Sequence, residues 1–204
     1  MIKHLLAIAF ALLCGLAFAL TPAQLATLRA DINADATLSA LANNGDTAID
    51  IAAAYNATSN PAMSVWRTDA PVNDIYDAID WTKYTPNDLA DVTVIFSNRV
   101  LLVQTKQMNL QNMLTGRTTL NASKANIRAG LRDAVTALPS GTGGALVSPG
   151  GTGGATVLQA CIRTATRAEK LFAGAPATTG PTTANLLVFE GAITAQDVSQ
   201  ARAN

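Results

Sequence analysis

The amino-acid sequence predicts a mainly α-helical protein: a helical bundle with a long central helix, extended loops and a C-terminal β-strand and tail. Apolar residues recur at spacings of three and four over much of the chain, which is the period of one helix face. Several of these runs follow a Thr, Asp or Asn residue, and such residues cap helix N-termini. The best strand candidate is the segment 185–190 (NLLVFE), which lies between Gly and Pro residues.

The composition favours a protein whose surface is covered by neighbours. Charged residues make up only 14% of the 204 residues, and 14 basic and 14 acidic residues cancel to a formal net charge of zero. Few charges and many small residues are unusual on the surface of a free-standing soluble monomer. The zero net charge, with no aromatic residues among the basic ones, also argues against sequence-specific binding of nucleic acid.

Residues 1–19 read as a leader. Lys3 is followed by the uncharged apolar run 5–16, and Ala17-Phe18-Ala19 fits a signal-peptide cleavage site. The segment is short for a stable membrane span. The alternative is an upstream start codon that adds residues to a cytoplasmic protein. A helical domain over 20–173, with a flexible Gly-rich loop at 140–155, and a linker and tail over 174–204 complete the expected organisation.

The first helix is expected to begin at a capping box. Thr21 caps it, Pro22 occupies the first helical position, and Gln24 closes the box, so the helix runs to about Ala34. The same reasoning places three further helical segments and one extended segment before the central helix. The helical segments are 35–41 with Asp35 or Thr37 as its cap, 46–56 with Ile49, Ile51, Ala52 and Tyr55, and 71–79. The extended segment is 63–69.

Residues 92–138 are expected to form the central pair of helices, with a break at 116–120. The stripe that repeats along the first helix consists of Phe96, Val100, Val103, Gln107, Leu110 and Leu114. The later half of this helix brings amides, including Gln107 and Gln111, close to Met108 and Met113. Two interpretations remain open: a core helix with a polar outer face, or a subunit contact with adaptable packing.

The second helix of the pair is expected to start at Asn121 as its N-cap. Lys124, Arg128 and Arg132 repeat at every fourth position on one face. Like charges at this spacing repel weakly within a helix. They form either a solvated face or a contact with an acidic partner surface.

The last part of the chain carries the third group of candidate interface residues. After a helical region at 155–172, with a break near 164–165, Leu187, Val188 and Phe189 form the centre of the expected strand. That strand would pair with another subunit or with residues 63–68 of the same chain. Thr194 opens a short final helix, with Asp197 in its first turn.

The sequence offers no catalytic, cofactor or metal signature. His4 is the only histidine, which excludes a Ser-His-Asp, Cys-His or histidine-bearing metal site in the body of the chain. The Gly-rich loop has no Lys and therefore cannot be a phosphate-binding P-loop. Asp74, Asp77 and Asp80 share a helix face but lack a calcium-loop pattern. We expect no enzyme activity and no cofactor; the enzymatic alternative is a carboxylate-dependent hydrolase that uses Asp74, Asp77 or Glu169.

Several segments resemble a family of small proteins from the virion-assembly gene clusters of tailed phages and prophages. The similar segments are LTPAQLATLRADI (20–32), VWRTD (65–69), IDWTKYTPND (79–88), QTKQMNLQNMLTGR (104–117), NIRAGLRDAV (126–135), ATRAEKLFA (165–173) and the FEG…DV tail (189–198). They cover most of the chain after the leader.

The resemblance implies a structural virion protein at the head–tail junction. Such proteins are helical, ring-forming adaptors, and a C-terminal tail reaches the portal. The resemblance therefore implies a homo-oligomeric ring, contact with the portal and neighbouring junction proteins, and assembly into virions in the host cytoplasm. The leader departs from this pattern and supports an alternative: a non-enzymatic binding or surface protein exported to the periplasm.

Overall fold

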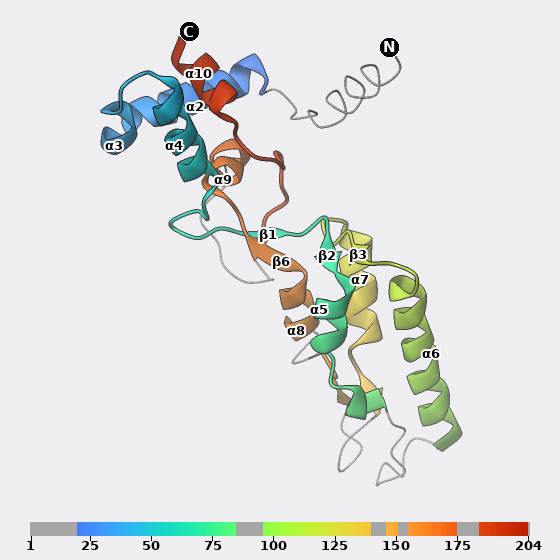
Figure 1. Cartoon of the computed structure of the whole chain (residues 1–204). Helices are drawn as coiled ribbons and strands as arrows, with labels where there is room; N and C mark the ends of the chain where they lie inside the picture. Colours follow the sequence, from blue (N-terminus) through green and yellow to red (C-terminus); the bar gives the residue numbers. More distant parts are fainter. Residues whose placement is uncertain (1–19, 85–95, 140–145, 151–154, 175–183, 204) are drawn as a thin grey trace, which may run out of the picture. The chain divides into compact units, whose positions relative to one another are not determined.

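A computed structural model describes residues 20–84, 96–139, 146–150, 155–174 and 184–203 of the chain, and it is predominantly helical (Figure 1). The chain forms two compact units, each assembled from separate stretches of sequence. The first unit contains Met1–Pro61, Ala165–Ala175 and Val188–Asn204, and the second contains Ala62–Thr164 and Pro176–Leu187. The division into 20–173 and 174–204 follows the order of the chain, whereas these units bring distant stretches together.

The first unit is entirely helical in its described elements. These are α2 (Pro22–Ala34), α3 (Ala36–Ser39), α4 (Gly45–Asn56), α9 (Arg167–Ala173) and α10 (Ala195–Ala203). Helix α10 packs against both α2 and α4, and α9 packs against the same two helices. Their shared core includes the fully buried Leu28, Ile32, Ile51, Tyr55 and Val198.

Short polar side chains start the helices of this unit. Thr21 and Gln24 form the expected capping box of α2, and the Asp35 carboxylate caps α3 by accepting from the amides of Thr37 and Leu38. Thr194 and Asp197 bond reciprocally at the start of α10. Each cap satisfies amide groups that have no partner within the helix, so these three predicted starts are confirmed.

The second unit mixes helices with short strands. Its helical elements are α5 (Val72–Asp77), the 3₁₀ helix η1 (Trp81–Tyr84), α6 (Phe96–Leu114), α7 (Ala125–Ala134) and α8 (Ala155–Ala160). Its strands are β1 (Ser64–Trp66), β2 (Ala70–Pro71), β3 (Thr119–Leu120), β4 (Leu138–Pro139), β5 (Leu146–Val147) and β6 (Ile162–Thr164). They pair antiparallel as β1 with β6, β2 with β3, and β4 with β5.

Helix α6 places one face in the core of the second unit. Val103, Leu110 and Leu114 of the predicted stripe are buried there, whereas Gln107 is half-buried. Helix α7 packs alongside α6 (Figure 1). A Cβ atom at Gly130 of α7 would lie 3.0 Å from the sulfur of Met113, so the glycine allows this close approach.

One expected helix start is wrong. Asn121 does not cap α7; its side chain accepts from Ser123 in a preceding turn, and Lys124 occupies the N-cap position. In α4, Ala48, Ile51, Ala52 and Tyr55 form the buried face, and Ile49 is exposed. The two helices expected after residue 155 are present as α8 and α9, and the strand β6 lies between them.

The expected strand at 185–190 is also not formed. Asn185 makes a single parallel bridge with Val65 of β1, and the residues from Leu186 to Glu190 belong to no strand. The alternative of pairing with 63–68 thus holds at one residue only. One bridge leaves most of the backbone of this β-forming sequence outside any sheet.

Candidate interaction surface

Helix α6 has a second, outward face that carries no charge. We call this face the α6 surface; it consists of the exposed residues Leu101, Leu102, Gln104, Thr105, Met108, Asn109, Gln111 and Asn112. Leu101 and Met108 are 63% and 55% exposed. Large apolar side chains and uncharged amides therefore share the solvent side of a 19-residue helix.

The two charged residues of α6 point away from this face. Arg99 and Lys106 are both buried. The Lys106 ammonium donates to the backbone carbonyl of Asp133 at 2.5 Å and to its carboxylate at 3.3 Å. Both charged side chains of the helix are thus buried, although a solvent-facing helix surface usually carries charges for solubility.

The residues predicted as interface differ in their surroundings. Gln111 belongs to the α6 surface, and Gln107 lies half-buried beside it. Lys124 and Arg132 on α7 are exposed. The Arg128 guanidinium instead turns inward, donates to the carbonyls of Ala122 and Ser123 at 2.8 and 2.7 Å, and lies over the Trp66 ring at 4.5 Å. Two of the three basic residues are therefore available to a partner, and the third holds its own unit together.

The tail segment Leu186–Phe189 presents apolar side chains in an alternating pattern. Leu186 and Val188 are 55% and 78% exposed, whereas Leu187 and Phe189 are half-buried. The Phe189 ring packs edge-to-face on Phe172 at 4.8 Å between centroids. Among the described residues, the backbone groups of these four residues have no hydrogen-bond partner. The segment is thus an apolar stretch with a bend at Val188, and its backbone groups are free among the described residues.

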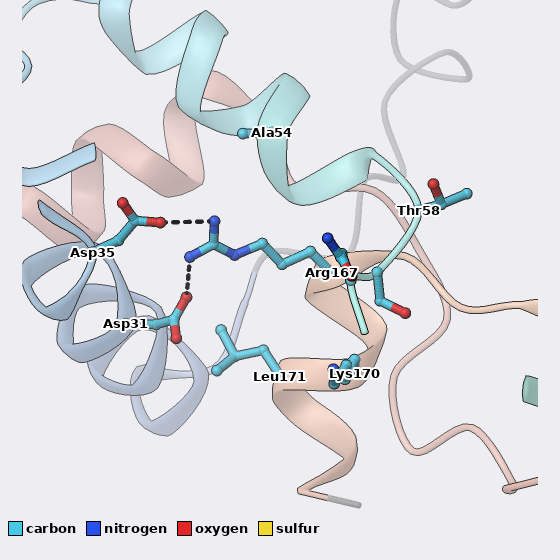
Figure 2. A pocket seen from close by; sticks show the side chains of 9 residues that line it. Asp31, Asp35, Ala54, Thr58, Arg167, Lys170 and Leu171 are labelled. Atoms are coloured by element: carbon cyan, nitrogen blue, oxygen red, sulfur yellow. Dashed lines mark hydrogen bonds and ion pairs between the residues drawn. The ribbon is translucent and has the colours of Figure 1, made fainter. Parts of the chain in front are cut away.

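The first unit contains a polar hollow of about 690 Å³ (Figure 2). Its wall is formed by residues of α2, α4 and α9 and of the loop after α4: Asp31, Asp35, Ala54, Thr58, Ser59, Asn60, Arg167, Lys170 and Leu171. The Arg167 guanidinium reaches between two carboxylates and binds Asp31 at 2.8 Å and Asp35 at 3.0 Å (Figure 2). Lys170 donates to the carbonyl of Pro61 at 2.7 Å.

Tyr55 completes this cluster, and the Arg167 guanidinium lies over its ring. Its ring lies 4.5 Å from the guanidinium carbon, and its hydroxyl donates to Asp31 at 2.5 Å. Burial and this hydrogen bond raise the pKa of Tyr55 well above its usual value. The amide of Leu38 and the guanidinium of Arg167 lower the pKa of Asp35. Each charged side chain in the wall is bonded to its neighbours, so the cluster is suited to clamp the helices together.

Two of the three carboxylates considered for catalysis, Asp74 and Glu169, also have structural partners. Asp74 lies 3.6 Å from the Arg67 guanidinium, and Asp80 accepts from the amide and hydroxyl of Thr82. Glu169 is buried and closes the capping box of α9 with Thr166. Asp77 is exposed on α5. No cluster of three potential metal ligands occurs within the described residues.

Sequence reasoning missed the Arg167 cluster. Asp31 and Arg167 are 136 residues apart, and neither belongs to a motif that would pair them. The sequence does place Leu101 and Met108 together on a face apart from the predicted stripe, because they are seven positions apart.

Comparisons with known proteins identify no relative. No protein family matches the chain, and no curated protein and no solved structure shows significant similarity to it. In the part of the chain that the structure describes, no helix combines the length and apolar character needed to cross a membrane.

Proposed function

We propose that this protein is a non-enzymatic structural component of a tailed-phage particle, a ring-forming adaptor at the head–tail junction. In this proposal the copies contact one another through their helical surfaces, and the C-terminal tail binds the portal. Helix α6 is then the central helix of the assembled bundle. The segment 185–190 becomes a β-strand when it adds to a sheet of the portal.

The α6 surface is the observation that carries this proposal. Leu101 and Met108 are more than half exposed on a helix face with no charged residue. Apolar area that leaves water on association contributes about 25 cal/mol per Å², and uncharged amides lose less hydration free energy on burial than charged groups do. Such a face is suited to a contact that persists in an assembly.

The tail supports the portal contact independently. Leu186 and Val188 are both exposed and lie two positions apart, so they would share one side of the segment if it formed a strand. The free backbone groups of Leu186–Phe189 could bond to the edge of a partner sheet, and the two exposed side chains would fill pockets beside it. The exposed Lys124 and Arg132 could contact acidic groups of a junction protein.

The proposal is tested by sizing the purified chain from Leu20 onward, alone and with the portal protein of the same gene cluster. We expect the chain alone to form a multimer and to comigrate with portal. Leu186→Asp combined with Val188→Asp should abolish portal binding and leave the multimer intact, because these side chains are exposed. Ile49→Asp is the matched control, since Ile49 is also exposed, at 59%. A strict monomer that ignores portal would contradict the proposal.

A second candidate function rests on the leader. Residues 1–19 carry the pattern of a secretory signal, which favours an exported, non-enzymatic binding or surface protein. Recovery from the periplasm of a chain that begins at Leu20 would support this candidate. Recovery from the cytoplasm of a chain that retains Met1–Ala19 would contradict it.

A further inference from the structure

We infer that the α6 surface of one copy packs against the α6 surface of a neighbouring copy of the chain. This inference rests on the proposed assembly role and names the surface through which two copies pair. Contact between two like surfaces joins the copies in pairs, and a ring also needs a second, unlike contact between the pairs. It concerns the second unit alone, where α6 belongs.

The spacing of the exposed residues is that of a helix–helix contact. Leu101, Thr105, Met108 and Asn112 are all exposed and follow one another at intervals of four, three and four. This is the interval of the core positions in paired helices, which keeps one stripe directed at the partner helix. The opposite face of α6 is already occupied, because Val103, Leu110 and Leu114 are buried within the unit. The outward stripe is therefore a second packing face.

The residues beside this stripe indicate which partner fits it. Leu102 and Asn109 flank it on one side, and Gln104 and Gln111 flank it on the other. In paired helices, these flanking positions usually carry the charges that select partner and orientation. Here they carry none, so two copies of this face can meet without bringing like charges together.

A partner face with charged residues would fit less well. Its charges would lose hydration on docking and would find no opposite charge on α6 to compensate for that loss. The α6 surface of a second copy has the same uncharged amides and the same Leu and Met side chains. The formal net charge of zero also leaves no strong long-range repulsion between copies of the chain. A second copy therefore meets the requirement for an uncharged, partly apolar face, and we take it as the occupant.

Two variants that place opposite charges at position 108 test this inference. Met108→Glu and Met108→Lys should each raise the concentration at which the assembly dissociates by about 100-fold, because each buries an unpaired charge at every contact. An equal mixture of the two variants should restore assembly, since Glu from one copy then faces Lys from the next. Ile49→Glu and Ile49→Lys are the matched controls, because Ile49 is 59% exposed and Met108 is 55% exposed.

The measurements are sedimentation velocity over a range of concentrations and urea unfolding of each variant. At a concentration where every chain is monomeric, unchanged unfolding midpoints are expected, because the substituted side chain lies outside the core. Recovery of assembly only in the mixture supports contact between α6 surfaces. Loss of assembly with no recovery in the mixture shows that α6 meets a different surface, and overturns the inference.

Two further outcomes separate this inference from the proposed function. If both Met108 variants assemble like the unsubstituted chain, the inference fails and the adaptor role stands, with another surface joining the copies. If the unsubstituted chain is monomeric at every concentration, the inference fails together with the ring-forming part of the proposed function. In that case, a segment of the same chain or an unrelated protein covers the α6 surface.

Discussion

The Arg167 side chain connects three helical segments of the first unit through one guanidinium group. It binds Asp31 of α2 and Asp35 at the start of α3, and it covers the ring of Tyr55 on α4. Charge-assisted hydrogen bonds and a stacked aromatic ring stabilise more than an isolated surface ion pair does. The side chain is about one-third exposed, so solvent screening reduces each contribution.

Replacing Arg167 should therefore destabilise the first unit. We expect Arg167→Gln to lower the free energy of unfolding by about 2 kcal/mol, because two carboxylates lose their partner and the Tyr55 ring loses its cover. Arg132→Gln is the control; Arg132 is exposed, and its substitution should change stability by less than about 0.5 kcal/mol. Urea unfolding of both variants checks this. Equal midpoints would show that the cluster contributes no stability.

The same cluster predicts an acid-sensitive contribution from Asp35. Its pKa is lowered in the folded protein by the Leu38 amide and by Arg167. A carboxylate with a lowered folded pKa adds stability that is fully present above its unfolded pKa of about 3.9. That stability is lost as pH falls through the folded value, so the loss lies below about pH 4.

The measurement is urea unfolding of the wild type and of Asp35→Asn between pH 7 and pH 2.5. Asn retains an oxygen acceptor for the α3 cap but cannot titrate. We expect the wild type to be more stable at pH 7 and the difference to shrink as the pH falls below about 4. A difference that stays constant to the lowest pH would contradict this assignment.

At the scale of elements, Gly150 fixes a close contact within the second unit. A Cβ atom there would overlap a methyl group of Val157 and would lie 3.1 Å from a methyl group of Val135. Val157 on α8 and Val135 after α7 are both fully buried. The backbone at Gly150 therefore passes directly over two β-branched core residues, which cannot turn aside without strain.

We expect Gly150→Ala to lower the stability of the second unit by about 1–3 kcal/mol, the usual cost of an overpacked core. Gly45→Ala is the matched control, because nothing lies within 4 Å of a Cβ at Gly45 and alanine favours the helix that begins there. Thermal unfolding followed by circular dichroism measures both. An unchanged melting temperature for Gly150→Ala would contradict the packing described for this segment.

The elements also show which parts of the fold were predictable from sequence. Helix starts at Thr21, Asp35 and Thr194 were predicted because each depends on residues within three positions of the cap. Strand β6 was missed because its partner β1 lies about one hundred residues earlier in the chain. The strand expected at 185–190 failed for the complementary reason: a β-forming composition needs a partner edge, and Asn185 alone finds one.

For the candidate surface, too, the sequence predicted the residues along the helix but not which of them are exposed. The amides and methionines of α6 were recognised from the sequence, but their exposure depends on which face the rest of the unit covers. Arg128 and Arg132 share a spacing pattern, yet only the structure distinguishes the inward guanidinium from the exposed one. The contacts of Arg167 with Asp31 could not be predicted from the sequence, because α2 and α9 are brought together by tertiary packing.

At the scale of the whole molecule, two features support an assembly role over a solitary one. An uncharged, partly apolar helix face lies on the second unit, and the apolar segment Leu186–Phe189 has backbone groups with no partner among the described residues. Both are surfaces that association would complete. In the polar hollow, in contrast, Arg167 already binds Asp31 and Asp35, and Lys170 binds the carbonyl of Pro61.

Quantitative mass spectrometry of purified phage particles from the strain that carries this gene tests the central claim most directly. The account predicts that peptides of this chain occur in the particles at several copies for each particle, at a fixed ratio to the portal protein. Particles that are complete and infective but contain no peptide of this chain would contradict it.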